Sequence, residues 1–288
     1  MSSRQPVNVV NRQQRAYYES RFEAAGGSEA AANRLTNLWT KVRRRIQAHD
    51  QAIGTASDKV ADHQRWLGDL TGQAVLDLGC FTGNELSLWL AENARSYVGL
   101  DLSESAAAEL HRELESAGLT GSAYVLAGDF LNNDFPAQCF DVVYAHSVLH
   151  HFEDIRVVLD ELDRVLKPGG VVVSIDPLAT EPLNRLARAA YRPFQSDRAW
   201  EWPFSFQTFR VLREYFELDR VQGYRGFSML SLPLAVLPFM RAPAMRLGRL
   251  GRRLERGLAS RQGPALWICW VVSLRMVKHV GMSGARGS

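Results

Sequence analysis

Short apolar runs alternate with amphipathic segments along the middle of the chain. Such apolar runs predict strands, and segments with apolar residues three or four positions apart predict helices. The predicted strands are 74–78, 96–101, 123–126, 140–144 and 171–175, and the predicted helices are 84–91, 103–117 and 154–166. Near-continuous apolar strands between amphipathic helices are typical of a parallel sheet covered on both faces, so the predicted fold class is α/β.

Two further strands are predicted after residue 177, where the regular alternation ends. They are residues 216–224 and the apolar run 266–274, which bring the sheet to seven strands. Between them, residues 229–264 are interpreted as an insertion, in which an apolar segment broken by Pro233 and Pro238 precedes an arginine-rich stretch. No uninterrupted apolar run reaches the roughly 20 residues that a membrane-spanning helix needs.

The N-terminal segment is expected to be helical. Helices are predicted at 11–22, from Ser28 through Ile46, and at 58–67, and they would cover one edge or mouth of the sheet. The expected organisation is therefore an N-terminal helical cap at 1–70, a main domain formed by 71–228 together with 265–278, and an inserted segment at 229–264.

Composition places the chain among ordinary globular proteins, with 288 residues, 46% hydrophobic and 23% charged. A net charge of +3 is too small to indicate a nucleic-acid partner by itself, and no nucleic acid is expected. Three scattered cysteines do not form a disulfide framework, and the first residues carry no apolar signal core. A cytoplasmic location is therefore expected, with peripheral membrane contact as an addition that the insertion suggests.

The stretch from Val75 to Asn84 is the centre of the chemical argument. An apolar strand ends near Asp77, turns through Gly79 and Gly83, and opens into a helix. In an open α/β sheet this arrangement presents backbone N–H groups to a nucleotide-like ligand. The Gly-x-x-x-Gly spacing differs from the Gly-x-Gly-x-x-Gly of dinucleotide sites. A dinucleotide oxidoreductase is therefore disfavoured.

Other polar residues follow the neighbouring strands. Asp101 ends the second strand 22 residues after Gly79, which suits an acid that binds ribose hydroxyls. Asp129 follows the third strand, and the segment from His146 to Phe152 follows the fourth. Because the carboxyl ends of parallel strands share one edge of the sheet, these residues are expected to surround one ligand.

Together these motifs resemble those of class I S-adenosylmethionine-dependent methyltransferases, especially the small-molecule branch with the ubiquinone/menaquinone-type and sugar O-methyltransferases. Asp77, Gly79 and Gly83 match the first motif, in which Phe81 replaces the middle glycine. Residues 162–170 resemble a second motif of this family, in which a helix is followed by a turn and a strand. The resemblance implies a Rossmann-like, seven-stranded, mostly parallel sheet, with S-adenosylmethionine as cofactor and S-adenosylhomocysteine as product. The positions assigned to cofactor binding are Asp77, Gly79, Cys80, Phe81, Gly83, Asp101, Leu102, Asp129, Phe130 and His146.

Methyl transfer to a hydroxyl also needs a base. The resemblance implies that a histidine pair and an acid after the fifth strand flank the acceptor, and the matching residues are His150, His151 and Asp176. His151 is expected to be the base, because histidine takes up a proton near neutral pH. No metal is expected, since adjacent histidines do not readily share one ion.

The acceptor is expected to be a hydrophobic small molecule or secondary metabolite, methylated on oxygen. An aromatic wall would bind it, although core packing explains such residues equally well. The predicted acceptor contacts are Tyr18, Trp200, Trp202 and Phe204. C- or N-methylation, a non-catalytic cofactor-binding protein, and either a lid or a membrane-interface role for 229–264 stay open as alternatives.

Overall fold

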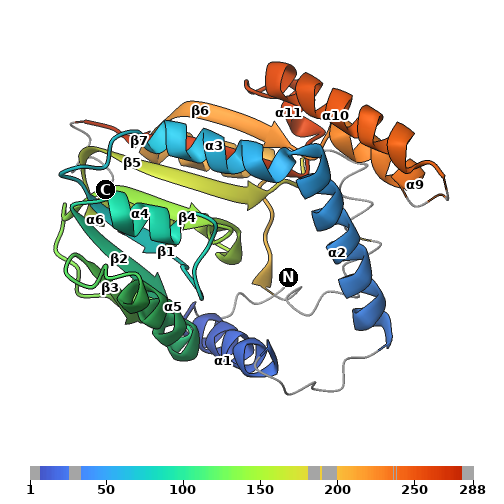
Figure 1. Cartoon of the computed structure of the whole chain (residues 1–288). Helices are drawn as coiled ribbons and strands as arrows, with labels where there is room; N and C mark the ends of the chain where they lie inside the picture. The colour runs from blue at the N-terminus through green and yellow to red at the C-terminus, as the bar shows by residue number, and fades with distance from the viewer. Residues whose placement is uncertain are drawn as a thin grey trace. The chain divides into compact units, whose positions relative to one another are not determined.

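The computed structural model describes residues 7–25, 34–180, 189, 200–235, 237 and 239–280 (Figure 1). Contacts between residues divide the chain into two compact units. The first unit comprises Met1–Ala31, Asp69–Val172 and Val277–Ser288, and the second comprises Ala32–Gly68 and Val173–Met276. The predicted division into cap, main domain and insertion stays a prediction.

Seven strands form one sheet in the order β3-β2-β1-β4-β5-β7-β6. Their bounds are β1 Ala74–Leu78, β2 Ser96–Asp101, β3 Ala123–Ala127, β4 Phe140–His146, β5 Leu166–Pro177, β6 Phe216–Tyr224 and β7 Val271–Lys278. β1 pairs in parallel with β2 and with β4, and β2 pairs in parallel with β3. The predicted seven-stranded, mostly parallel α/β sheet is confirmed. The strand order reverses between β1 and β4, which is where open sheets of this class bind ligands.

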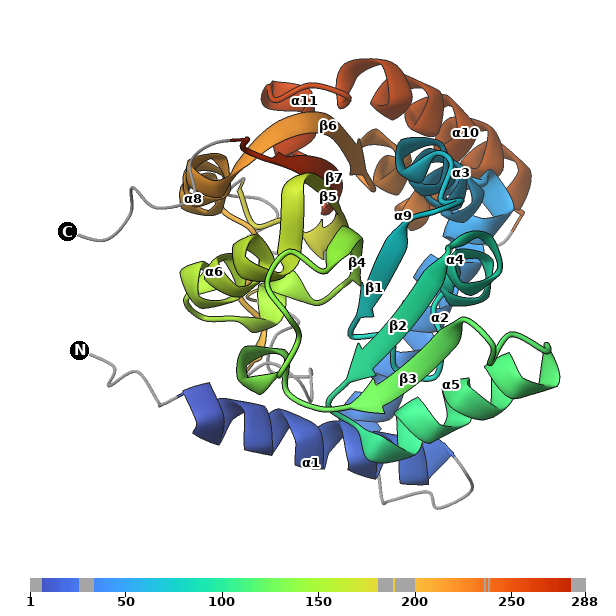
Figure 2. The same cartoon turned by 90° about the vertical axis from the view of Figure 1, so that its left-hand side faces the viewer.

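Helices of the first unit cover both faces of its strands. They are α1 Val7–Ala25, α4 Ser87–Asn93, α5 Glu104–Ser116 and α6 Ile155–Val165, with the short 3₁₀ helices η1 Phe130–Asn132 and η2 Leu149–His151. Figure 2 shows α4 and α5 on one side of these strands and α6 on the other. As expected from the sequence, Ser103 caps α5 by accepting a hydrogen bond from the Ala106 N–H, and Gly118 ends it with a φ of 73°.

The core of the first unit is aliphatic. β1 is buried along its whole length, so its side chains are excluded from water on both faces of the sheet. Fully buried aliphatic side chains of the first unit include Val75, Leu76, Leu90, Leu110, Leu114, Val143, Leu159 and Leu162.

The second unit contains α2 Arg34–Ile53, α3 Thr55–Leu67, α8 Phe206–Tyr215, η5 Phe227–Ser231, α9 Leu232–Ala235, α10 Arg241–Leu258 and α11 Pro264–Trp267. Ser205 and Thr208 form a reciprocal capping box at the start of α8. Among the helices that the structure describes, none combines the length and the apolar character needed to cross a membrane.

Several predicted boundaries are wrong for local reasons. The last strand was expected from Leu266, but Pro264 begins the short helix α11, so β7 starts at Val271 and continues to Lys278. The helix expected from Asn84 starts at Ser87, because the Asn84 side chain supports the turn before it. β5 begins directly after α6, at Leu166, where a loop was expected. The predicted cap of the second helix, Ser28, lies outside the described residues.

Candidate functional site

A pocket of the first unit opens at the carboxyl ends of β1, β2 and β4. Figure 2 shows α1 lying across these strand ends. The pocket is lined by Asn11, Gln14, Tyr18, Leu78, Gly79, Phe81, Leu100, Asp101, Leu102, Gly128, Asp129, Phe130, His146, Ser147, Val148, His151 and Phe152. It therefore collects most of the residues that the sequence predicted for the cofactor, together with His151 and Tyr18.

Gly79 occupies a turn that no larger residue fits. Its φ is 68°, in the left-handed region, and its N–H donates to the Leu100 carbonyl over 2.7 Å. A Cβ added at this position would lie 2.3 Å from Cγ2 of Val148. Both the backbone conformation and the close approach of the loop after β4 therefore require glycine.

Phe81 occupies the position of the middle glycine in the motif that the sequence resembles, yet it keeps a glycine-like backbone. Its φ is 48°, and its N–H donates to Oδ2 of Asp101 over 2.8 Å. A left-handed conformation costs a non-glycine residue about 1–2 kcal/mol, which this charge-assisted hydrogen bond offsets in part. Its ring lines the pocket 6.2 Å from the ring of Tyr18. The substitution thus preserves the turn and adds an aromatic wall.

Asp77 is buried behind the turn and does not line the pocket. It accepts hydrogen bonds from Ser87 Oγ at 2.6 Å, Tyr97 Oη at 2.9 Å and Asn84 Nδ2 at 3.0 Å. Burial raises the pKa of Asp77 to about 6, and these three hydrogen bonds oppose the rise. Its contacts make it a support of the turn. Cys80, which is also fully buried, and Gly83 are likewise absent from the pocket lining.

Asp101 joins the first two strand ends. Its Oδ2 accepts from the Phe81 N–H and its Oδ1 from the Ser103 N–H, at 2.8 and 2.9 Å. Burial raises the pKa of Asp101, the two N–H groups lower it, and the nearby Glu19 raises it again. A carboxylate has about four acceptor positions, so Asp101 retains acceptor capacity for ligand hydroxyls. Leu102, the next residue, provides apolar lining.

Asp129 and Phe130 form the edge of the pocket after β3. Oδ1 of Asp129 caps η1 by accepting from the Leu131 N–H, and its Oδ2 accepts from Nδ2 of Asn11 over 2.7 Å. Phe130 is buried beside it. Asp129 therefore links the strand-end loops to α1.

Asn11, Gln14 and Tyr18 are pocket residues on α1, and only Tyr18 among them was predicted from the sequence. Gln14 Nε2 donates to the His151 carbonyl over 3.2 Å, and Tyr18 Oη lies 3.1 Å from His151 Nε2. Their spacing of three and four residues puts all three on one face of the helix. This spacing was visible in the sequence, but nothing there indicated which element the face would meet.

The two adjacent histidines lie in different environments. His151 lines the pocket, whereas His150 is buried with its ring centroid 4.2 Å from that of His151. His146 also lines the pocket and stacks on Tyr144. Of the predicted pair, His151 is thus the one that a ligand in this pocket would meet.

The remaining predicted residues belong to the second unit. Asp176 is fully buried near the end of β5, and Trp200 and Trp202 are partly exposed. Phe204 is also buried, with its ring edge-on to Phe209. Core packing accounts for Phe204, and acceptor contacts of these four residues stay predictions.

Comparisons with known proteins agree with this geometry. The family described as "Methyltransferase domain" matches residues 76–174. A sterol 24-C-methyltransferase of Aspergillus fumigatus is 33% identical over 126 residues, which cover 42% of this chain and 33% of that protein. The demethylmenaquinone methyltransferase of Lactococcus lactis is 34% identical over 158 residues, 48% of this chain and 60% of that protein.

The fold also matches a solved structure over nearly its full length. Geranyl diphosphate C-methyltransferase from Streptomyces coelicolor, in complex with S-adenosyl-L-homocysteine, has a TM-score of 0.56 at 13% identity. The match covers 95% of this chain and 100% of that protein. The chain spans only about a third of the length of the sterol methyltransferases that it matches. Residues 76–174, which the family matches, contain the strand-end motifs and most of the pocket wall. Residues 76–174 of this chain therefore match the methyltransferase domain family, and the seven-stranded sheet around them has the Rossmann-like fold of S-adenosylmethionine-dependent methyltransferases.

Proposed function

We propose that this chain is a methyltransferase that transfers a methyl group from S-adenosylmethionine to a hydrophobic small molecule. The observation that carries the proposal is the convergence of Gly79, Asp101, Asp129 and His151 on one pocket. The first three are the positions that the resemblance assigns to the cofactor, and the fourth is a proton acceptor. Each comes from the end of a different parallel strand.

The residues present fit the cofactor. When bound, S-adenosylmethionine supplies an electrophilic methyl group on a sulfonium. Gly79 presents its backbone to the pocket in a turn that only glycine fits, Asp101 has acceptor positions left for ribose hydroxyls, and Asp129 is available to the adenine amino group. The rings of Phe81 and Phe130 offer apolar surface beside these groups.

His151 is proposed as the base. A base placed within reach of the acceptor contributes about 10²–10⁴-fold to a rate. The Tyr18 hydroxyl lies 3.1 Å from His151 Nε2, so a proton from the acceptor can reach His151 directly or through Tyr18. Gln14 donates to the backbone carbonyl of His151, which helps to hold this residue at the pocket.

Carbon is the acceptor atom that we favour. Two of the compared proteins are C-methyltransferases by name, acting on a sterol and on geranyl diphosphate. Methylation of an alkene creates a carbocation that must lose a proton, and aromatic rings such as those of Tyr18, Phe81 and Phe152 stabilise cations. The O-methylation expected from the sequence stays a prediction, because His151 could equally deprotonate a hydroxyl.

The test is transfer of a labelled methyl group. The full chain is incubated with methyl-labelled S-adenosylmethionine and a sterol, geranyl diphosphate or a demethylmenaquinone, and the label is followed into the organic phase. NMR of the product then distinguishes a C-methyl from an O-methyl group. If the chain binds the cofactor but transfers label neither to these acceptors nor to any component of a lipid extract, a non-catalytic cofactor-binding protein would be favoured.

The role of His151 has its own variants. His151→Ala and His151→Gln are expected to lower kcat by about 10²–10⁴-fold with S-adenosylhomocysteine affinity nearly unchanged. Tyr18→Phe, which keeps the ring but removes the hydroxyl, should lower kcat by about 10-fold and shift its pH profile. Unchanged turnover in His151→Gln would remove this residue from the mechanism.

A further inference from the structure

The inner face of α10 is fixed to the second unit by small residues and one buried acid. Gly248 and Gly251 are buried, and a Cβ at Gly251 would lie 2.6 Å from the backbone of Phe227. Glu255 is the only acidic residue of α10, and its Oε1 accepts from the N–H groups of Gly226 and Ser228 at 2.8 and 2.6 Å. Glu255 therefore contributes no negative charge to the outer face of α10.

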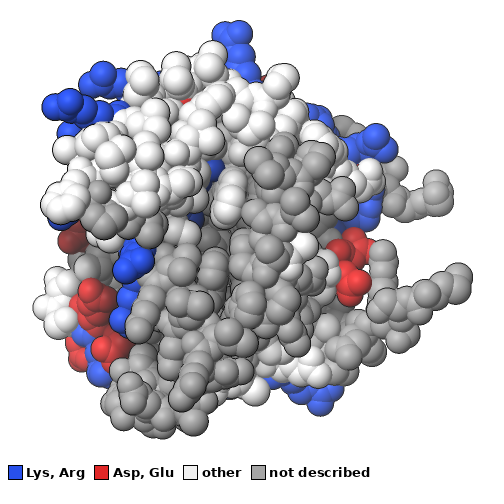
Figure 3. All heavy atoms as spheres, turned by 90° about the vertical axis from the view of Figure 1, so that its right-hand side faces the viewer, with Lys and Arg blue, Asp and Glu red and all other residues white. Residues whose placement is uncertain are grey.

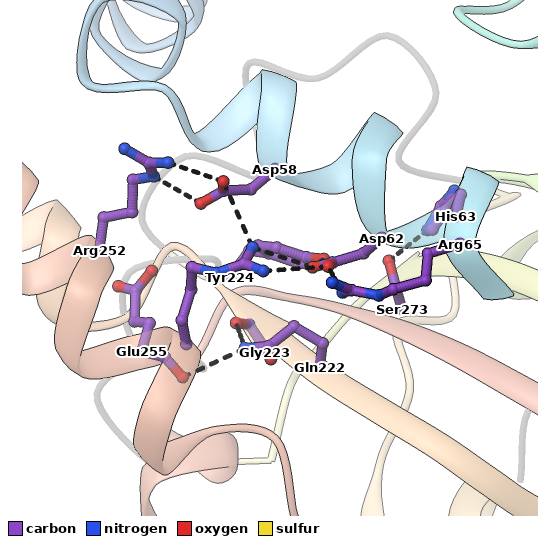
Figure 4. A network of polar contacts seen from close by, with 11 residues as sticks. Asp58, Asp62, His63, Arg65, Gln222, Gly223, Tyr224, Arg252, Glu255 and Ser273 are labelled. Carbon is purple, nitrogen blue, oxygen red and sulfur yellow. Dashed lines mark hydrogen bonds and ion pairs between the residues drawn. The ribbon is translucent and has the colours of Figure 1, made fainter.

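Two of the arginines of α10 also point inward. Figure 4 shows Arg252 paired with Asp58 of α3, at 2.7 Å between Nη2 and Oδ1. Arg256 donates to both carboxylate oxygens of Asp62 at 3.1 Å, and Tyr224 Oη donates to the same carboxylate. These ion pairs hold α10 against α3 and β6, so Arg252 and Arg256 are not available to a partner.

The rest of α10 presents two adjacent ridges to solvent. Leucines at spacings of three and four residues form the first ridge, and their side chains are 36–57% exposed: Leu247, Leu250, Leu254 and Leu258. Exposed arginines one position earlier form the second: Arg246, Arg249 and Arg253. Hence the outer face is apolar and basic, and none of its residues is acidic.

The apolar surface continues before the helix. Leu230 and Leu237 are more than half exposed, and Phe239 is fully exposed. In Figure 3 the part of the surface where α9 and α10 lie is largely uncharged, with basic side chains along its border. Large exposed apolar side chains gathered on one surface, and bordered by one sign of charge, mark an interaction site.

We propose that this face, formed by α10 together with Leu230, Leu237 and Phe239, binds the surface of an anionic membrane. The helix is about 27 Å long and amphipathic, with leucines to enter the headgroup boundary and arginines to contact lipid phosphates. Charge complementarity selects an anionic lipid surface, because each basic residue near such a surface contributes about 1 kcal/mol, or about fivefold in binding. The proposal does not depend on the proposed methyl transfer.

Co-sedimentation of the full chain with vesicles tests this directly. Wild type is expected to sediment with vesicles of phosphatidylcholine mixed with phosphatidylglycerol, to remain in solution with phosphatidylcholine alone, and to be released by high salt. Arg246→Gln/Arg249→Gln/Arg253→Gln should lower the partition coefficient by about 100-fold, as three fivefold losses multiply. Leu250→Ser/Leu254→Ser should lower it by about 10-fold or more.

Matched controls lie in the first unit. Leu126→Ser removes a leucine of β3 that is 45% exposed, and Arg112→Gln removes an exposed arginine of α5. Both should leave vesicle binding unchanged, and circular dichroism should show that every variant keeps its helices. No sedimentation with anionic vesicles, or equal binding to neutral ones, would overturn the proposal. A lipid-free dimer that Leu250→Ser/Leu254→Ser dissociates would assign the face to a second copy of the chain.

Discussion

Gly79→Ala is the substitution whose effect the structure defines most closely. The added Cβ meets Cγ2 of Val148 at 2.3 Å, so the valine or the turn must move by about 1 Å to reach an ordinary contact. Alanine at a φ of 68° costs about 1 kcal/mol in strain, and overpacking in a closed site costs about 1–3 kcal/mol. The expected loss of unfolding free energy is therefore about 2–4 kcal/mol.

Gly118→Ala is the matched control, because it carries the strain without the clash. Gly118 has a φ of 73° and no atom within 4 Å of an added Cβ. Its substitution should cost only about 1 kcal/mol. Urea unfolding followed by tryptophan fluorescence measures both losses, and the difference between them isolates the clash with Val148.

Val148→Ala in the Gly79→Ala background provides the second arm of the experiment. Removing Cγ2 should recover about 1–3 kcal/mol relative to the sum of the two single losses. Gly79→Ala should also weaken S-adenosylhomocysteine binding, which Gly118→Ala should leave unchanged. Equal destabilisation by Gly79→Ala and Gly118→Ala, with no coupling to Val148, would refute the assignment of this turn as a close-approach site.

Two further predictions concern buried carboxylates. Because burial raises the pKa of Asp77 to about 6 in the folded chain, above the ordinary 3.8, its protonated form is favoured by folding. The unfolding free energy of wild type relative to Asp77→Asn should therefore fall by up to about 3 kcal/mol as the pH rises from about 4 to about 6, and should then level off. Urea unfolding at several pH values measures this difference, and parallel profiles of the two proteins would contradict the prediction. Arg256→Gln should cost about 1–3 kcal/mol because the buried Asp62 loses a partner, whereas Arg253→Gln on the same helix should stay within about 0.5 kcal/mol; equal losses would show that the ion pair adds nothing.

The strand-end residues could be predicted because the parallel sheet brings them together. Once the apolar runs are strands in parallel, Gly79, Asp101 and Asp129 must share one edge. Whether a residue at that edge lines the pocket or lies behind the turn could not be predicted. β1 is buried throughout, so its sequence shows no alternation that would place Asp77 behind the turn.

Contacts between distant elements were the other limit. Asn11 meets Asp129 across 118 positions of sequence, and only the docking of α1 brings them together. For the same reason, the arginines of α10 that pair with α3 could not be distinguished in the sequence from those exposed to solvent. Asp58 and Asp62 on α3 repeat the four-residue spacing of Arg252 and Arg256, and the pairing becomes recognisable only once the two helices lie side by side.

Calorimetric titration of the full chain with S-adenosylhomocysteine tests the central claim most directly. The claim is that the pocket bounded by Gly79, Asp101 and Asp129 is the cofactor site. It predicts binding at one site per chain, a marked loss of affinity in Asp129→Ala, and no binding of NAD. Absence of S-adenosylhomocysteine binding, binding unaffected by Asp129→Ala, or binding of NAD in its place would contradict the claim.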